Sequence, residues 1–207
     1  MKKIAIVGAG GFAREVLWLL SDMGLESRVG GFFESDDVWT EREVSSLPVR
    51  PISSLDSEHW QSVLAVGNPV IRKNLRDSLP DNMTYPTLVH PSALHSRRIE
   101  LGAGAIVCAG TILTCDITIA EHVHLNLGTT VGHDCTLHAF VTTAPAVNIS
   151  GQCNIGEFAY IGSNACLREA IHVAAGATIG MGAVVVSNIE DAGTYVGNPA
   201  KKLTKIN

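Results

Sequence analysis

The chain has 207 residues, of which 46% are hydrophobic and 17% charged, so it holds enough apolar side chains to fold around a core. Its formal net charge of −5 at pH 7 argues against nucleic acid as a partner. No apolar run approaches the ~20 residues that span a bilayer, and Arg14 and Glu15 soon follow the run Ile4–Gly11. We therefore expect a cytoplasmic protein without membrane insertion, whose five cysteines stay reduced.

The first third of the chain alternates short apolar strands with amphipathic helices. The pattern predicts strands over Lys3–Val7, Val29–Phe33 and Ser62–Val66, and helices over Phe12–Met23 and Val70–Leu79. This alternation is typical of a parallel sheet with right-handed crossovers. We predict that residues 1–88 form a short Rossmann-like domain.

A glycine-rich turn, Gly8-Ala9-Gly10-Gly11, joins the first predicted strand to the first predicted helix. Glycines let a ligand approach the backbone, and the helix N-terminus offers N–H groups to an anion. A dinucleotide fold needs two such halves and only one is present, so the turn favours a mononucleotide or its sugar. A tight turn without any ligand is the alternative interpretation.

Ligands of open α/β sheets bind at the carboxyl edge, where Glu34 and the pair Gly67-Asn68 are expected to lie. Glu34 is a candidate for contact with a ribose or a base, with a solvated strand-end charge as the equal alternative. Arg72 and Lys73 are better explained by a solvated helix face than by contact with a diphosphate.

A six-residue repeat fills the second half of the chain. Residues 89–190 divide into 17 hexads without an insertion, and the first position is Ile, Leu or Val in 15 of them, with His95 and Thr143 as the exceptions. The fifth position is always small or aliphatic. Three hexads predict one coil of a triangular prism, whose parallel strands stack at ~4.8 Å with positions one and five inside.

This repeat predicts a parallel β-helix over residues 89–207, including a C-terminal tail. A β-sandwich is the alternative, but its strands alternate with a period of two and vary in length. Cys135 and Cys153 both occupy fifth positions 18 residues apart, so we expect them to be stacked, buried and apolar in role.

One hexad carries the residues best suited to chemistry, His133 and Asp134. The third position of a hexad points outward near a corner, and the adjacent carboxylate can orient an imidazole that acts as general base. Gly151 follows one coil later and is expected to present a backbone N–H beside that base, where an oxyanion would form. A surface histidine without a role is the alternative.

The order of these features resembles the sugar acyltransferases that include bacterial nucleotide-4-amino-sugar N-acetyltransferases and sialic-acid O-acetyltransferases. The shared features are the turn Gly8–Gly11, the hexads of residues 89–190 and the tail Gly197-Asn198-Pro199-Ala200-Lys201. The resemblance implies a left-handed β-helix, a homotrimer, acetyl-CoA as co-substrate, a nucleotide-activated amino sugar as acceptor, and no metal. The expected activity is acetyl transfer to the sugar amine in surface-glycan biosynthesis, with O-acetyl transfer as the alternative.

The resemblance also assigns roles to individual residues. It implies that His133 is the catalytic base, that Asp134 assists it, and that the sugar nucleotide contacts Gly10, Gly11, Phe12, Glu34 and Ser35. Coenzyme A is expected near Gly151, Ser163 and His172. Two positions depart from the family, because Phe12 and Thr142 stand where relatives carry histidines; we place Thr142 among the acetyl-CoA contacts.

Two other classes of protein fit parts of the sequence. A zinc carbonic anhydrase of the same β-helix type would use the spacing of His133 and His138, but Arg97 stands near the place of the third ligand and His95 is displaced from it. A solenoid that only presents a binding face is the second rival. The glycine-rich turn and the His133-Asp134 pair favour the acetyltransferase over both.

Overall fold

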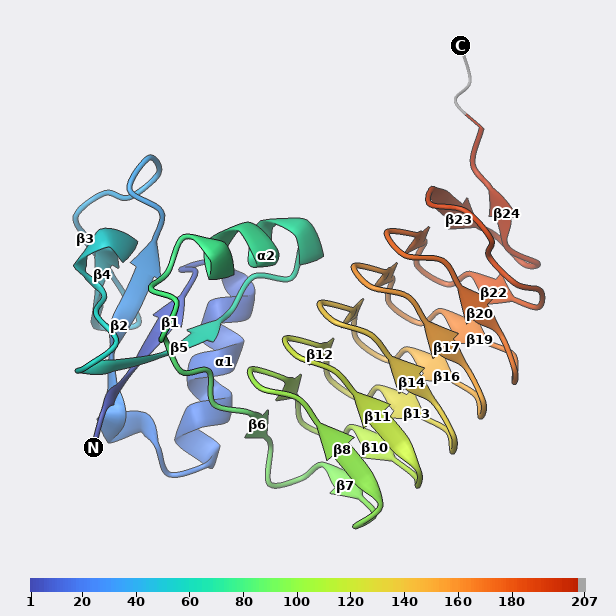
Figure 1. The fold of residues 1–207 in the computed structure, drawn as a ribbon, viewed down its shortest axis with the longest axis horizontal. Helices are drawn as coiled ribbons and strands as arrows, with labels where there is room; N and C mark the ends of the chain where they lie inside the picture. The colour runs from blue at the N-terminus through green and yellow to red at the C-terminus, as the bar shows by residue number, and fades with distance from the viewer. Residues whose placement is uncertain (205–207) are drawn as a thin grey trace. The chain divides into compact units, whose positions relative to one another are not determined.

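The computed structural model describes residues 1–204, and these form two compact units (Figure 1). The first unit is Met1–Pro91 and the second begins at Ser92. Each unit has its own layers and its own buried side chains, so each is described by itself.

The N-terminal unit is a five-stranded sheet with two helices. Its elements are β1 (Lys3–Val7), α1 (Gly11–Asp22), a 3₁₀ turn (Glu26–Arg28), β2 (Val29–Glu34), β3 (Arg42–Val44), β4 (Leu47–Pro51), a 3₁₀ turn (Ile52–Ser54), β5 (Trp60–Leu64) and α2 (Pro69–Asp77), with β6 (Leu88–Val89) near its end. The strand order is β3-β4-β2-β1-β5, and all neighbours are parallel except β3 and β4. The three predicted strands and two predicted helices are confirmed, whereas the β3–β4 hairpin was not predicted.

Alternate residues of β1 face opposite sides of this sheet, as the period of a strand requires. Ala5 and Val7 belong to a buried cluster with Leu75 and Leu79, which α2 and the residues after it supply. Ala13, Val16, Leu19 and Leu20 of α1 are buried, and this helix contacts β1. The sheet is therefore held by apolar packing, and its carboxyl edge remains at the surface, where ligands can reach it.

The second unit is a left-handed parallel β-helix with three sides, as predicted. The first side contains β7 (Leu94–His95), β10 (Ile112–Leu113), β13 (Thr130–Val131), β16 (Asn148–Ile149), β19 (Cys166–Leu167) and β22 (Val184–Val185). The second contains β8 (Ile99–Leu101), β11 (Ile117–Ile119), β14 (Thr136–Leu137), β17 (Asn154–Ile155) and β20 (His172–Val173). The third contains β9 (Ile106–Val107), β12 (His124–Leu125), β15 (Thr142–Thr143), β18 (Tyr160–Ile161), β21 (Thr178–Ile179), β23 (Thr194–Val196) and the antiparallel β24 (Lys201–Lys202).

Each hexad of the β-helix places its residues in the same way. The strands pair in register with those 18 residues away, for example Thr130 with Asn148, and Figure 1 shows the coils stacked one on the next. First positions such as Leu137 and fifth positions such as Cys135 and Cys153 are buried, as expected. The fourth position has a left-handed backbone, with φ of 59° at Asp134 and 61° at Gln152. All five cysteines are free.

Candidate active site

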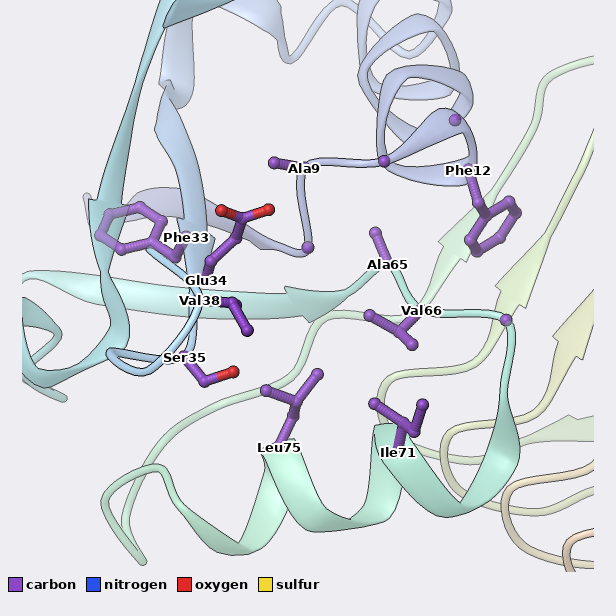
Figure 2. A pocket seen from close by; sticks show the side chains of 14 residues that line it. Ala9, Phe12, Phe33, Glu34, Ser35, Val38, Ala65, Val66, Ile71 and Leu75 are labelled. Carbon is purple, nitrogen blue, oxygen red and sulfur yellow. The ribbon is translucent and has the colours of Figure 1, made fainter. Parts of the chain in front are cut away.

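A pocket of about 370 Å³ opens at the carboxyl ends of β1, β2 and β5 (Figure 2). The turn after β1 lines it with Gly8, Ala9, Gly10, Gly11 and Phe12; β2 and the residues after it contribute Phe33, Glu34, Ser35 and Val38; and β5 and α2 contribute Ala65, Val66, Gly67, Ile71 and Leu75. Figure 2 shows Ile71 and Leu75 projecting from α2 into the pocket. Six of the seven predicted substrate-binding residues therefore line one cavity.

The glycines of the turn differ in what they do. Gly8 has a φ of +114°, and a Cβ there would lie 2.9 Å from the carbonyl oxygen of Ala65, so the fold itself needs glycine at this position. A Cβ at Gly10 or Gly11 would meet nothing within 4 Å. These two glycines leave open space over the N-terminus of α1, which has no side-chain cap and favours a negatively charged ligand.

Glu34 is the only ionisable residue among those of residues 1–204 that line the pocket, and it is held in an ion pair rather than solvated. Nη2 of Arg42, on β3, donates to Oε1 and to Oε2 of Glu34, at 2.8 Å each. The Glu34 side chain is only 18% exposed. Because a carboxylate has about four acceptor sites, the Arg42 contact leaves Glu34 able to accept from a ligand hydroxyl or N–H.

One predicted residue at this edge stands outside the pocket, and one other expectation is wrong. Asn68 does not line the pocket: its Oδ1 accepts from the backbone N–H of Ile71 at 3.0 Å, so it is the N-cap of α2. Arg72 does not lie on a solvated face, because it is fully buried and donates from Nη1 to the carbonyl oxygens of Val66 (2.8 Å) and Gly67 (3.3 Å). Burial lowers the pKa of Arg72 to about 9, and its carbonyl contacts brace the wall of the pocket.

The β-helix brings His133, Asp134 and Gly151 together at the turn between its first and second sides, which we call the His133 corner. Nδ1 of His133 lies 2.7 Å from Oδ2 of Asp134. Since a carboxylate only accepts, this contact assigns a proton to Nδ1, and in the neutral imidazole Nε2 then has the lone pair. The two side chains are 58% and 53% exposed, so a substrate can reach this imidazole.

A groove of about 300 Å³ lies beside the His133 corner, on the first side of the β-helix. Its lining includes Gly132 and Ser150, which directly precede His133 and Gly151. The groove also follows the outer faces of β10, β13 and β16. His133 does not line the groove itself, but it directly follows the lining residue Gly132, so one end of the groove lies next to the His133 corner. The hexad repeat could have indicated this groove, because the groove runs along the outward positions of adjacent coils.

The other predicted acetyl-CoA contacts lie elsewhere on the β-helix. His172 is exposed on the second side, which adjoins the His133 corner. Ser163 lies at the turn between the third and first sides, and Thr142 is 4% exposed on the third side. Within one chain, the structure therefore does not bring Ser163 and Thr142 to His133.

In residues 1–204, no three His, Cys, Asp or Glu side chains lie close enough together to hold a metal ion. Over the same residues, neither helix is long and apolar enough to cross a membrane.

The fold and the His133 corner define an acyltransferase of the left-handed β-helix class. Residues 3–79 match the PglD N-terminal domain. The acetyltransferase domain of PglB from Neisseria gonorrhoeae FA1090 is 35% identical over 98% of this chain and 100% of that chain, with a TM-score of 0.89. The chain therefore belongs to the PglB/PglD family of left-handed β-helix acetyltransferases.

Two further relatives carry a more specific name. The GDP-perosamine N-acetyltransferase of Escherichia coli O157:H7 is 29% identical over 99% of this chain and 98% of its own length. The structure of PerB from Caulobacter crescentus, in complex with CoA and GDP-perosamine, is 28% identical, with a TM-score of 0.89 over 99% of this chain and 98% of that chain. Because the chain belongs to this family, it is an acetyltransferase, and neither a zinc carbonic anhydrase nor a solenoid that only presents a binding face.

Proposed function

We propose that this protein transfers an acetyl group from acetyl-CoA to the amino group of a nucleotide-linked 4-amino sugar. The observation that carries the proposal is the exposed His133–Asp134 pair beside a groove of the β-helix. The relatives support the substrates: the PglB domain has been solved with acetyl coenzyme A, and PerB with CoA and GDP-perosamine.

In this proposal the two units divide the work. Residues 1–88 hold the nucleotide, with the base and ribose in the largely apolar pocket around Glu34 and Ser35 and the diphosphate near Gly10 and Gly11. Residues 89–207 hold acetyl-CoA and carry out the reaction. The pocket suits this role because its only charged lining group is an acceptor, which matches the hydroxyls of a ribose.

The reaction is a direct transfer. The sugar nitrogen attacks the thioester carbonyl carbon, and Nε2 of His133 accepts a proton from that nitrogen. The C–S bond then breaks as the imidazolium returns this proton to the sulfur, which releases CoA as its thiol. Asp134 keeps Nδ1 protonated and stabilises the imidazolium that forms. The backbone N–H of Gly151 is the proposed donor to the oxyanion. Glycan biosynthesis is the process that consumes such a product.

A cytoplasmic homotrimer completes the proposal. The five free cysteines fit a reducing compartment. Light scattering should give three times the chain mass of 21.9 kDa.

A substrate screen tests the proposed function. The purified protein is mixed with acetyl-CoA and one candidate acceptor at a time, from GDP- and UDP-linked 4-amino sugars to sialic acid, and CoA thiol release is followed. We expect turnover with a nucleotide-linked 4-amino sugar, and a product whose mass increases by one acetyl group. Turnover with sialic acid alone would instead assign O-acetyl transfer, and hydrolysis without acceptor would contradict both.

Replacing Arg42 with Ala should weaken the acceptor site alone. Without its partner, the Glu34 carboxylate loses its fixed position and repels the diphosphate of the substrate. We expect the KM for the nucleotide sugar to rise about tenfold, a size set by a partly exposed charge-assisted pair. The kcat and the KM for acetyl-CoA should be unchanged.

Lys73→Ala is the matched control, because it removes an exposed ion pair with Asp77 from the same unit without touching the pocket. An equal rise in KM for both variants would show that Arg42 acts through general charge rather than through Glu34.

A further inference from the structure

Gly151 lies directly against the imidazole of His133. A Cβ on Gly151 would be 2.7 Å from Cε1, 2.7 Å from Nε2 and 3.1 Å from Nδ1 of that ring. Distances below 3.0 Å are shorter than any van der Waals contact of carbon, so a side chain at 151 and the present ring position exclude each other.

The coil itself does not explain a glycine at this position. Glycines at second positions, such as Gly132, Gly156 and Gly162, are needed because a Cβ there would meet backbone atoms of the next coil at 2.5 to 2.6 Å. Glycines at fourth positions, such as Gly128 with φ +65°, have the left-handed backbone. Gly151 occupies a third position, and its φ lies outside the left-handed region.

The same column of the β-helix shows that this position accepts side chains. The third positions one coil before His133, two coils before it, and one coil after Gly151 are Cys115, Arg97 and Glu169. The backbone hydrogen bonds continue along this corner, from the N–H of Gln152 to His133 O (2.7 Å) and from the N–H of Ala170 to Gly151 O (2.9 Å). The glycine at 151 is thus explained by the ring that lies on it.

We infer that Gly151 is a positioning residue, whose missing side chain forms the seat of the His133 imidazole. The carboxylate of Asp134 holds the ring at Nδ1, and the bare backbone of Gly151 supports it near Cε1 and Nε2. Together they hold the ring in one orientation. The expected effect of Gly151 on catalysis rests on the proposed role of His133 as the base. The packing of the His133 ring against Gly151 does not depend on that role.

Gly151→Ala tests this inference in two ways. The variant should fold, because Ala is compatible with this backbone. The His133 ring must move, however, and its Nδ1 then loses the contact with Asp134. We expect kcat to fall up to about 100-fold, as a displacement of about 1 Å can cause, while the KM values for both substrates change little. The unfolding midpoint should fall when His133 is present and stay unchanged when the same substitution is made in His133→Ala.

Gly128→Ala is the control for kcat, because a Cβ at 128 would meet nothing within 4 Å and Ala146 already adopts this left-handed backbone one coil later, although the φ of +65° means that the substitution itself lowers the midpoint. It should leave kcat unchanged. Equal midpoint shifts for Gly151→Ala with and without His133 would overturn the inference, and so would a rise in the KM for acetyl-CoA with kcat intact. If the parent protein shows no acetyl transfer, the proposed function fails. The unfolding midpoints would still show whether the His133 ring packs against Gly151.

Discussion

His133→Ala is expected to reduce kcat for acetyl transfer between about 10² and 10⁴-fold, the range that a general base contributes. The reason is that Nε2 of His133 is the atom proposed to accept the proton of the attacking amine, and the neighbouring carboxylate of Asp134 is already engaged with Nδ1. The measurement is CoA thiol release at saturating concentrations of both substrates.

The fold should survive this substitution, because the His133 side chain is 58% exposed and carries no part of the prism interior. The unfolding midpoint should fall by no more than in Gly151→Ala, since both variants lose the contact of the ring with Asp134, and acetyl-CoA affinity should match that of the parent. His95→Ala is the control, since His95 is an exposed histidine of the same β-helix whose ring Nδ1 lies 3.1 Å from the carbonyl oxygen of Ser96. Near-normal turnover of His133→Ala would reject the assignment of the base.

The β-helix could be predicted almost completely from sequence because its geometry repeats. One hexad fixes the environment of each position, so the burial of Leu137 and the exposure of His133 both follow from their phase. The period of 18 residues also places Gly151 beside His133, which is the reason that the corner could be predicted from the sequence. The same period places Thr142 on the third side and Ser163 at a different corner from His133. Their assignment as acetyl-CoA contacts rested on the family resemblance and not on the period of the repeat.

The N-terminal unit contains features that its sequence did not predict. The β3–β4 hairpin escaped prediction because its strands are short and β4 contains Pro48 and Pro51, which are rare within strands. The partner of Glu34 was therefore missed, because Arg42 reaches it only through this hairpin. The role of Asn68 did carry a local signal: Asn followed by Pro69 at the first helical position is typical of a helix start.

Asp134→Asn keeps the His133 imidazole but changes the group that orients it, so this variant tests how much the orientation contributes to kcat. Asn is well tolerated at the left-handed φ of 59° found here, so the backbone should not change. An Asn amide can donate to Nδ1, which moves the proton to Nε2 and leaves no lone pair to accept the substrate proton. We expect kcat to fall roughly 10³-fold, less than for a fully buried His–Asp pair because Asp134 is 53% exposed.

Asp116→Asn provides the matched control for this prediction. Asp116 lies one coil before Asp134 at the same hexad position, with a φ of 57°, but its carboxylate is paired with Arg98 instead of an imidazole. Both substitutions remove one negative charge from the same corner, so only a specific contact with His133 makes their effects differ. Comparable losses of kcat in the two variants would mean that the charge of the corner, and not the orientation of the base, supports the reaction.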